Sequence, residues 1–97
     1  MNQEEQDNLN QQLIEASKKN NLEQIKLLIS QGADIHALDD CALRWSAENR
    51  NIKTVKYLVE QGADIHAQDD NALRWASEYN HLDVVKYFLF DFQMKIK

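Results

Sequence analysis

The segment GADIHALDDCALRWSAE at residues 32–48 is repeated as GADIHAQDDNALRWASE at residues 62–78, an offset of thirty residues. Thirteen of its seventeen positions are identical, and they include the uncommon tryptophans Trp45 and Trp75. A match of this length at a fixed offset indicates a repeat architecture, in which each unit packs mainly on its neighbours. A chain of 97 residues has room for about three such units.

The composition argues against several classes of function. A net charge of −5 and a pI near 5.0 disfavour nucleic acid or an anionic membrane surface as the partner. No apolar run approaches the roughly 18 residues of a membrane span, and the polar N-terminus does not read as a secretory signal. Cys41 is the single cysteine, so no internal disulfide is expected, and a reducing, cytoplasmic location is favoured.

Apolar residues at helical spacing predict three pairs of helices. The second helix of each pair reads LEQIKLLI, IKTVKYLV or LDVVKYFL and begins at Leu22, Ile52 or Leu82. Gly32 and Gly62 follow the first two of these helices, where glycine can take the positive φ of a C-terminal cap. Residues 1–8 are expected to be a polar, flexible lead-in, and residues 9–97 a single domain with units at about 9–38, 39–68 and 69–97.

The start of each later first helix has its own signal. The helix of the second unit is expected to begin near Ala42, with Asp40 or Cys41 as its N-cap. Asp40 precedes Arg44 by four positions, the spacing and order that favour an ion pair on a helix. The third unit repeats these features at Asp70, Ala72 and Arg74.

The repeated text resembles the ankyrin-repeat family. IKTVKYLVEQGADIHA at residues 52–67 is similar to the second helix of that family followed by its Gly-Ala-Asp-(Val/Ile)-Asn-Ala hairpin entry. CALRWSA at residues 41–47 stands where the family usually has Thr-Pro-Leu-His-x-Ala-Ala, with Leu43 and Ala47 matching. The resemblance covers about residues 9–89 and implies an all-α solenoid of three helix-turn-helix units with short, hairpin-like connections.

The chain departs from the family pattern in its period, which is usually about 33 residues and is 30 here. The missing residues fall between Asp39 and Cys41, where the family has an Asp-Gly tip. The connections are therefore expected to be too short to form strands. The 30-residue variant also resembles ankyrin arrays encoded by giant DNA viruses, which would place the protein in the host cell cytoplasm.

The resemblance implies a non-enzymatic module that binds a protein partner, as yet unknown, on the concave face of the array. The contact surface carried over to this chain consists of the connection tips and the exposed side of the first helices. Its members are Leu38, Asp40, Glu48, Asn49, Gln68, Asp70, Glu78 and Tyr79.

The C-terminal end suggests an alternative function. Phe92 replaces the expected glycine, and the apolar spacing continues through Phe88 and Leu89 to Ile96, so the last helix is expected to run on. This end could fold back on the last unit. It could also pair with another chain through Phe90 and Phe92, which would make the protein a weak homodimer in place of a monomer.

The remaining polar and aromatic candidates have structural explanations beside functional ones. Trp45 and Trp75 suit either packing between units or contact with a partner. His36 and His66 are expected to form hydrogen bonds in the connections, and paired aspartates at residues 39–40 and 69–70 could form an acidic rim for basic partners. Cys41 has no neighbouring base to activate it, and no metal-ligand or phosphate-loop spacing occurs, so no enzymatic activity, metal or cofactor is expected.

Overall fold

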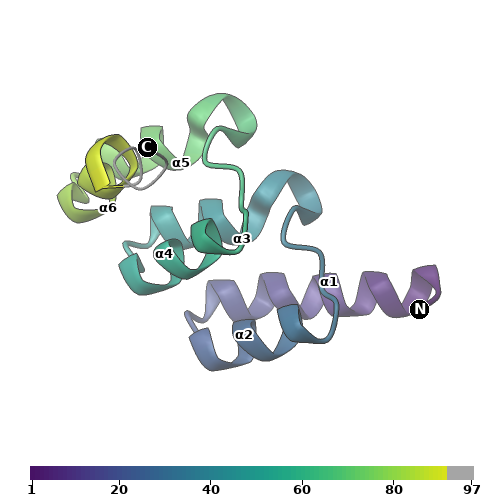
Figure 1. The fold of residues 1–97 in the computed structure, drawn as a ribbon. Helices are drawn as coiled ribbons and strands as arrows, with labels where there is room; N and C mark the ends of the chain where they lie inside the picture. Colours follow the sequence, from purple (N-terminus) through teal and green to yellow (C-terminus); the bar gives the residue numbers. More distant parts are fainter. Residues whose placement is uncertain (92–97) are drawn as a thin grey trace.

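The computed structural model describes residues 1–91, which fold into three antiparallel helix pairs and a short π-helical segment (Figure 1). Within these residues no strand forms, as expected for the shortened connections. None of the helices over the same range combines the length and hydrophobicity of a membrane span. The elements are α1 (Gln3–Lys18), α2 (Leu22–Ser30), α3 (Ala37–Glu48), α4 (Ile52–Glu60), α5 (Ala67–Glu78), α6 (Leu82–Lys86) and the π-helical η1 (Tyr87–Asp91).

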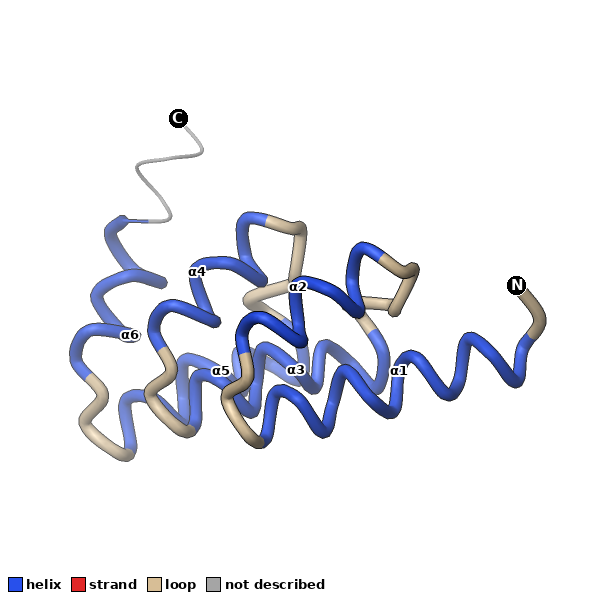
Figure 2. The backbone as a smooth tube through the Cα atoms, turned by 90° about the horizontal axis from the view of Figure 1, so that it is seen from below, coloured by secondary structure: helices blue, strands red, loops and turns tan. Residues whose placement is uncertain are grey.

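The three pairs stack side by side into a short solenoid. The first helices α1, α3 and α5 contact one another in one layer, and α2, α4 and α6 form the other layer (Figure 2). Contacts between successive first helices are much more extensive than those between second helices. Neighbouring helices are therefore packed more closely in the first-helix layer than in the second-helix layer. This arrangement confirms the predicted all-helical solenoid.

The N-terminal helix begins earlier than the sequence analysis placed it. Asn2 caps α1 by accepting a hydrogen bond from the backbone N–H of Glu5 at 2.8 Å. The side-chain amide of Gln6 donates to the carbonyl of Gly32 at 3.0 Å, which ties this turn to the first connection. Placing residues 3–8 outside the helix was wrong, because a capped and solvated helical turn needs no apolar periodicity.

The glycines end their helices as predicted. Gly32 has φ +107° and Gly62 has φ +101°, values that a side chain rarely tolerates. The N–H of Gly32 donates to the carbonyl of Ile29, and that of Ala33 donates to the carbonyl of Leu28. This pair of bonds is the Schellman motif, which satisfies carbonyls left open at a helix end. The helix boundaries of each pair are therefore fixed by local sequence.

Three consecutive residues before the right-handed part of α3 adopt left-handed backbone angles. They are Leu38, Asp39 and Asp40, with φ between 52° and 57°. In α5 the equivalent residues Gln68, Asp69 and Asp70 have φ between 54° and 61°. Such a conformation costs roughly 1–2 kcal/mol for each residue other than glycine. Arg44 offsets part of this cost by donating from Nε to the carbonyl of Asp39 and from Nη2 to that of Leu38, both at 2.9 Å.

The arginine contacts correct one expectation from the sequence. The predicted ion pair between Asp40 and Arg44 is wrong, and so is the equivalent pair in the third unit, where Arg74 donates to the carbonyls of Asp69 and Gln68. The left-handed turn directs its carbonyls at the guanidinium, which supplies several donors in a fixed geometry. The first unit has Ile14 at the equivalent position, and there α1 stays right-handed throughout.

The carboxylate of Asp40 binds the following unit instead of capping its own helix. Its Oδ2 accepts the backbone N–H of Asp64 at 2.7 Å, and the Nδ1 atom of His36 lies 3.0 Å from the same oxygen. One unit earlier, Oδ1 of Asn10 accepts the N–H of Asp34 at 2.8 Å. The N-cap role expected for Asp40 is therefore wrong, because its side chain is held in a hydrogen bond that joins neighbouring units.

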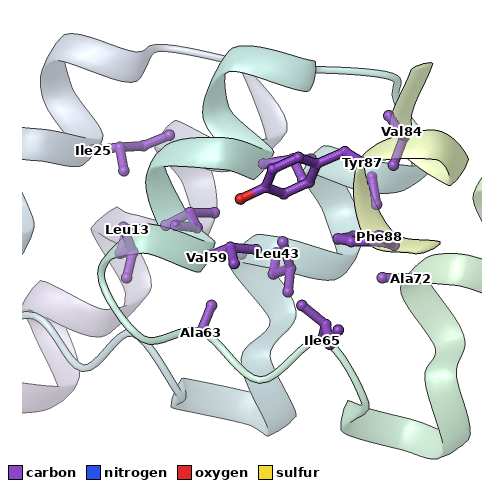
Figure 3. Close-up of a cluster of buried hydrophobic side chains, with 14 of the residues drawn as sticks. Leu13, Ile25, Leu43, Val59, Ala63, Ile65, Ala72, Val84, Tyr87 and Phe88 are labelled. Carbon is purple, nitrogen blue, oxygen red and sulfur yellow. The ribbon is translucent and has the colours of Figure 1, made fainter. Parts of the chain in front are cut away.

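The hydrophobic core runs through all three units, and the last helical segment closes it within the described residues. Tyr87 and Phe88 are 1% and 3% exposed, and Figure 3 shows both extending into the cluster that holds Leu43. A cation also lies over an aromatic ring at each step of the second-helix layer. The Nζ atom of Lys26 is 5.5 Å from the centre of the Tyr57 ring, and that of Lys56 is 5.7 Å from the Tyr87 ring.

The end of the described chain continues the last helix in a different form. After α6, the segment η1 carries the helical path to Asp91 with π-type geometry. Leu89 and Phe90 are exposed there, at 47% and 60%. Phe92 and Ile96 lie outside the described residues, so the proposed fold-back of this end stays a prediction.

Candidate interaction surface

The structure divides the predicted contact residues between the two ends of the first helices. Leu38, Gln68 and Asp70 lie in the left-handed first turns of α3 and α5, next to the connections between units. Glu48 and Asn49, like Glu78 and Tyr79 in the next unit, lie where a first helix ends and turns into its partner. The right-handed part of α3 separates the two groups by about 12 Å, at 1.5 Å per residue. The loops of Figure 2 form the same two separate rows.

The connection edge carries one exposed apolar side chain and several polar ones. Leu38 is 69% exposed and lines a groove of about 300 Å³ against α1. Its counterpart Gln68 donates from Nε2 to the carboxylate of Asp39 at 2.6 Å, so it binds across the unit boundary. Asp70 is bonded to His66 and is partly exposed. His36 and His66 each contact an aspartate four residues later, which confirms the hydrogen bonding predicted for these histidines.

Asp40 does not belong to a contact surface. It is 4% exposed, and both of its hydrogen-bond partners are within the chain. Assigning Asp40 to the partner-binding set was wrong, since a carboxylate committed to the next unit is unavailable to another molecule. Asp70 has the same place in the third unit but stays partly accessible, because no further connection follows it within residues 1–91.

The turn edge brings three of the predicted residues into one groove. Glu48, Asn49, Tyr79 and His81 line a hollow of about 470 Å³, here called the turn-edge groove. The ring of Tyr79 stacks on Trp75, with centroids 5.3 Å apart and planes 17° apart, and lies 5.9 Å from the ring of His81. Tyr79 keeps 49% of its surface exposed. The groove therefore offers a carboxylate and a partly open aromatic ring side by side.

Sequence reasoning did not assign His81 to this surface. His81 precedes α6, and its Nδ1 atom lies 3.3 Å from the carbonyl oxygen of Ala47, in the preceding unit. That contact fixes the turn before α6, and the ring also lines the groove. Glu78 is exposed beside the groove but does not line it. No sequence signal distinguishes these two placements, because both depend on the path of the turn.

The repeated tryptophans are half-buried, and their surroundings differ. The Nζ atom of Lys18 lies 5.3 Å from the centre of the Trp45 ring. In the next unit, Trp75 is covered by Tyr79. Trp45 therefore packs at the boundary with the first unit, as one of the two sequence hypotheses held, and Trp75 packs against the turn of its own unit.

The described residues bring no three metal-ligating side chains together. The carboxylate–histidine pairs in the connections bond to neighbouring backbone and to each other, which is a structural arrangement. Cys41 is half-buried in α3.

The family model described as ankyrin repeats, three copies, matches residues 13–97. Ankyrin repeats are generally protein–protein interaction modules, and the family is typically non-enzymatic.

Proposed function

This chain belongs to the ankyrin-repeat family, and we propose that it binds a partner protein along the first-helix layer, with the turn-edge groove as the centre of the contact. The binding is non-enzymatic and uses side chains that extend from a rigid stack. We place the protein in the cytoplasm. For a protein of a giant DNA virus, this is the cytoplasm of the infected host cell.

The observation that carries this proposal is the exposure of the side chains that vary between units within the predicted contact surface. The pairs are Leu38 with Gln68 and Asn49 with Tyr79, and all four residues are exposed. The identical Leu43 and Leu73 pack in or against the core. Repetition thus maintains the stack, and the surface that differs is free to determine which protein is bound.

Affinity purification with wild-type and variant chains tests the proposal. The double variant Asn49→Ala/Tyr79→Ala removes two exposed side chains from the groove, so captured partners are expected to fall by at least tenfold, about 1.4 kcal/mol of binding free energy. The matched control, Glu23→Ala/Lys53→Ala, removes two exposed side chains from the second-helix layer and leaves capture unchanged. Circular dichroism checks that both variants stay folded. Retention of every partner by the groove variant contradicts the proposed face.

Self-association through the C-terminal end is the second candidate function. Leu82 is 62% exposed, whereas the equivalent Leu22 and Ile52 are half-buried, and Phe90 adds a further exposed apolar surface. Apolar surface of this kind favours contact between chains.

Sedimentation velocity over a wide range of concentrations tests this candidate. A dimer is expected to form with rising concentration and to weaken by at least tenfold in Phe90→Asp, since a charge would be buried at the contact. Leu27→Asp, at a leucine of α2 that is 49% exposed, is the control that leaves association unchanged. A monomer at all concentrations rules out the second candidate.

A further inference from the structure

The first boundary between units contains a cation held between an aromatic ring and a carboxylate. Lys18 Nζ lies 5.3 Å from the centre of the Trp45 ring and 3.7 Å from the carboxylate of Glu15. A cation over an indole ring is attracted by the negative face of the π system. At this boundary the chain's own lysine therefore makes the cation–π contact with one of the repeated tryptophans.

The second boundary has the same ring and a carboxylate but no lysine in that place. Thirty residues after Lys18 stands Glu48, and thirty after Trp45 stands Trp75. Tyr79 stacks on Trp75 and presents about half of its surface to solvent in the groove that Glu48 also lines. The tryptophan of the first arrangement is therefore kept, while a carboxylate stands in place of the lysine and Trp45 stands in place of Glu15.

The charges around the groove favour an incoming cation. Glu48 and Glu78 contribute two carboxylates at this edge, and the nearby Arg50 is paired with Asp83 at 3.2 Å. Over the described chain, no basic side chain is paired with Glu48. The net charge of −5 adds a general attraction for basic partners.

We infer that the turn-edge groove binds an arginine side chain of the partner, with its guanidinium between the carboxylate of Glu48 and the exposed part of the Tyr79 ring. Arginine fits better than lysine, because its planar guanidinium can stack on an aromatic ring while it donates hydrogen bonds to a carboxylate. The amide of Asn49 donates to the carbonyl of Trp45, which holds that side chain at the rim. The inference deepens the proposed function and rests on it.

A titration followed by ¹H–¹⁵N NMR tests the inference directly. The probe is a capped Gly-Gly-Arg-Gly-Gly peptide, and the matched peptide carries citrulline, which keeps the shape of arginine but has no charge. Saturable shifts are expected at the backbone amides of Asn49, Tyr79 and His81 with the arginine peptide. The citrulline peptide is expected to bind about three- to tenfold more weakly, the range of a partly exposed cation–π contact combined with an ion pair.

Variants of the full chain assign the contact to the two groups. Tyr79→Leu keeps an apolar side chain without the ring, and Glu48→Gln keeps the shape without the charge. Each is expected to weaken binding of the arginine peptide at least threefold. Glu23→Gln, an exposed acid on α2, is the control and leaves binding unchanged. Tyr79 is exposed and Glu48 is half-buried outside the core, so the spectra of the free variants are expected to show an intact fold.

Two results overturn the inference. One is equal binding of the arginine and citrulline peptides, and the other is saturable shifts confined to the aspartates of the connection edge. Partner capture that depends on Asn49 and Tyr79 while the peptide shows no preference for arginine refutes this inference but supports the proposed function. Arginine binding in the groove without any captured partner refutes the proposed function alone.

Discussion

Asp40→Ala is expected to lower the free energy of unfolding by about 2–3 kcal/mol. The substitution removes an acceptor that is 4% exposed and leaves the N–H of Asp64 without its 2.7 Å bond. Hydrogen bonds to charged groups contribute about 1.5–3 kcal/mol. Urea unfolding followed by circular dichroism measures the change, with the slope against denaturant as the check on two-state behaviour. The total free energy of unfolding of a small domain is only about 5–15 kcal/mol, so a loss of this size is a large share of it.

The repeat supplies matched controls for this substitution. Asp70→Ala removes the equivalent carboxylate, which is partly exposed and bonded to His66, and is expected to cost less than about 1 kcal/mol. Asp40→Asn keeps an oxygen that can accept the Asp64 N–H, as Asn10 does for Asp34, and is expected to lie nearer to wild type than to the alanine variant. Equal losses for Asp40→Ala and Asp70→Ala would show that the bond between units contributes nothing measurable.

Arg44→Met is expected to destabilise the chain by about 2 kcal/mol. Methionine keeps much of the apolar stem but loses the two donors that bind the carbonyls of Leu38 and Asp39. Both bonds have a charged donor, and the turn that they hold is intrinsically unfavourable for residues other than glycine. Urea unfolding measures the loss, and amide hydrogen exchange at residues 38–41 is expected to quicken more than exchange in α2.

The control for this variant is a second arginine with a different contact. Arg50→Met breaks an ion pair with Asp83, in which the arginine side chain is 56% exposed and the aspartate 39%, and surface pairs of this kind contribute about 0–1 kcal/mol. Arg44→Lys keeps the charge without the planar set of donors, so it is expected to lose most of what Arg44→Met loses. Full stability in Arg44→Met would mean that the left-handed turn holds without its arginine.

Most of the fold could be predicted because its signals are local. The apolar spacing from Ile52 identified α4, and Gly32 and Gly62 ended α2 and α4 at the expected places. Repetition then carried each assignment from one unit to the next. The start of α1 was missed because its first turn depends on the cap at Asn2 and on solvation, and neither produces an apolar pattern.

The left-handed turn and the groove could not be predicted, for a different physical reason. An Asp-Asp pair before a helix reads as a cap, and an arginine four residues later reads as its ion-pair partner. Both residues instead bind elsewhere, because the backbone of Leu38, Asp39 and Asp40 has positive φ in this turn. The groove joins Glu48 to His81 across a unit boundary, and spacing within one copy does not contain that information.

The joints between units have a consequence for how such a chain can change length. The same hydrogen bond joins units twice, between Asn10 and Asp34 and between Asp40 and Asp64. The same cation–π contact also occurs twice, between Lys26 and Tyr57 and between Lys56 and Tyr87. Each pair of contacts forms one joint between neighbouring units. A tandem duplication of thirty codons inserts one whole joint and breaks none. The number of units can therefore rise or fall in a single genetic event without any compensating substitution, while point changes at positions such as Tyr79 alter recognition independently of length.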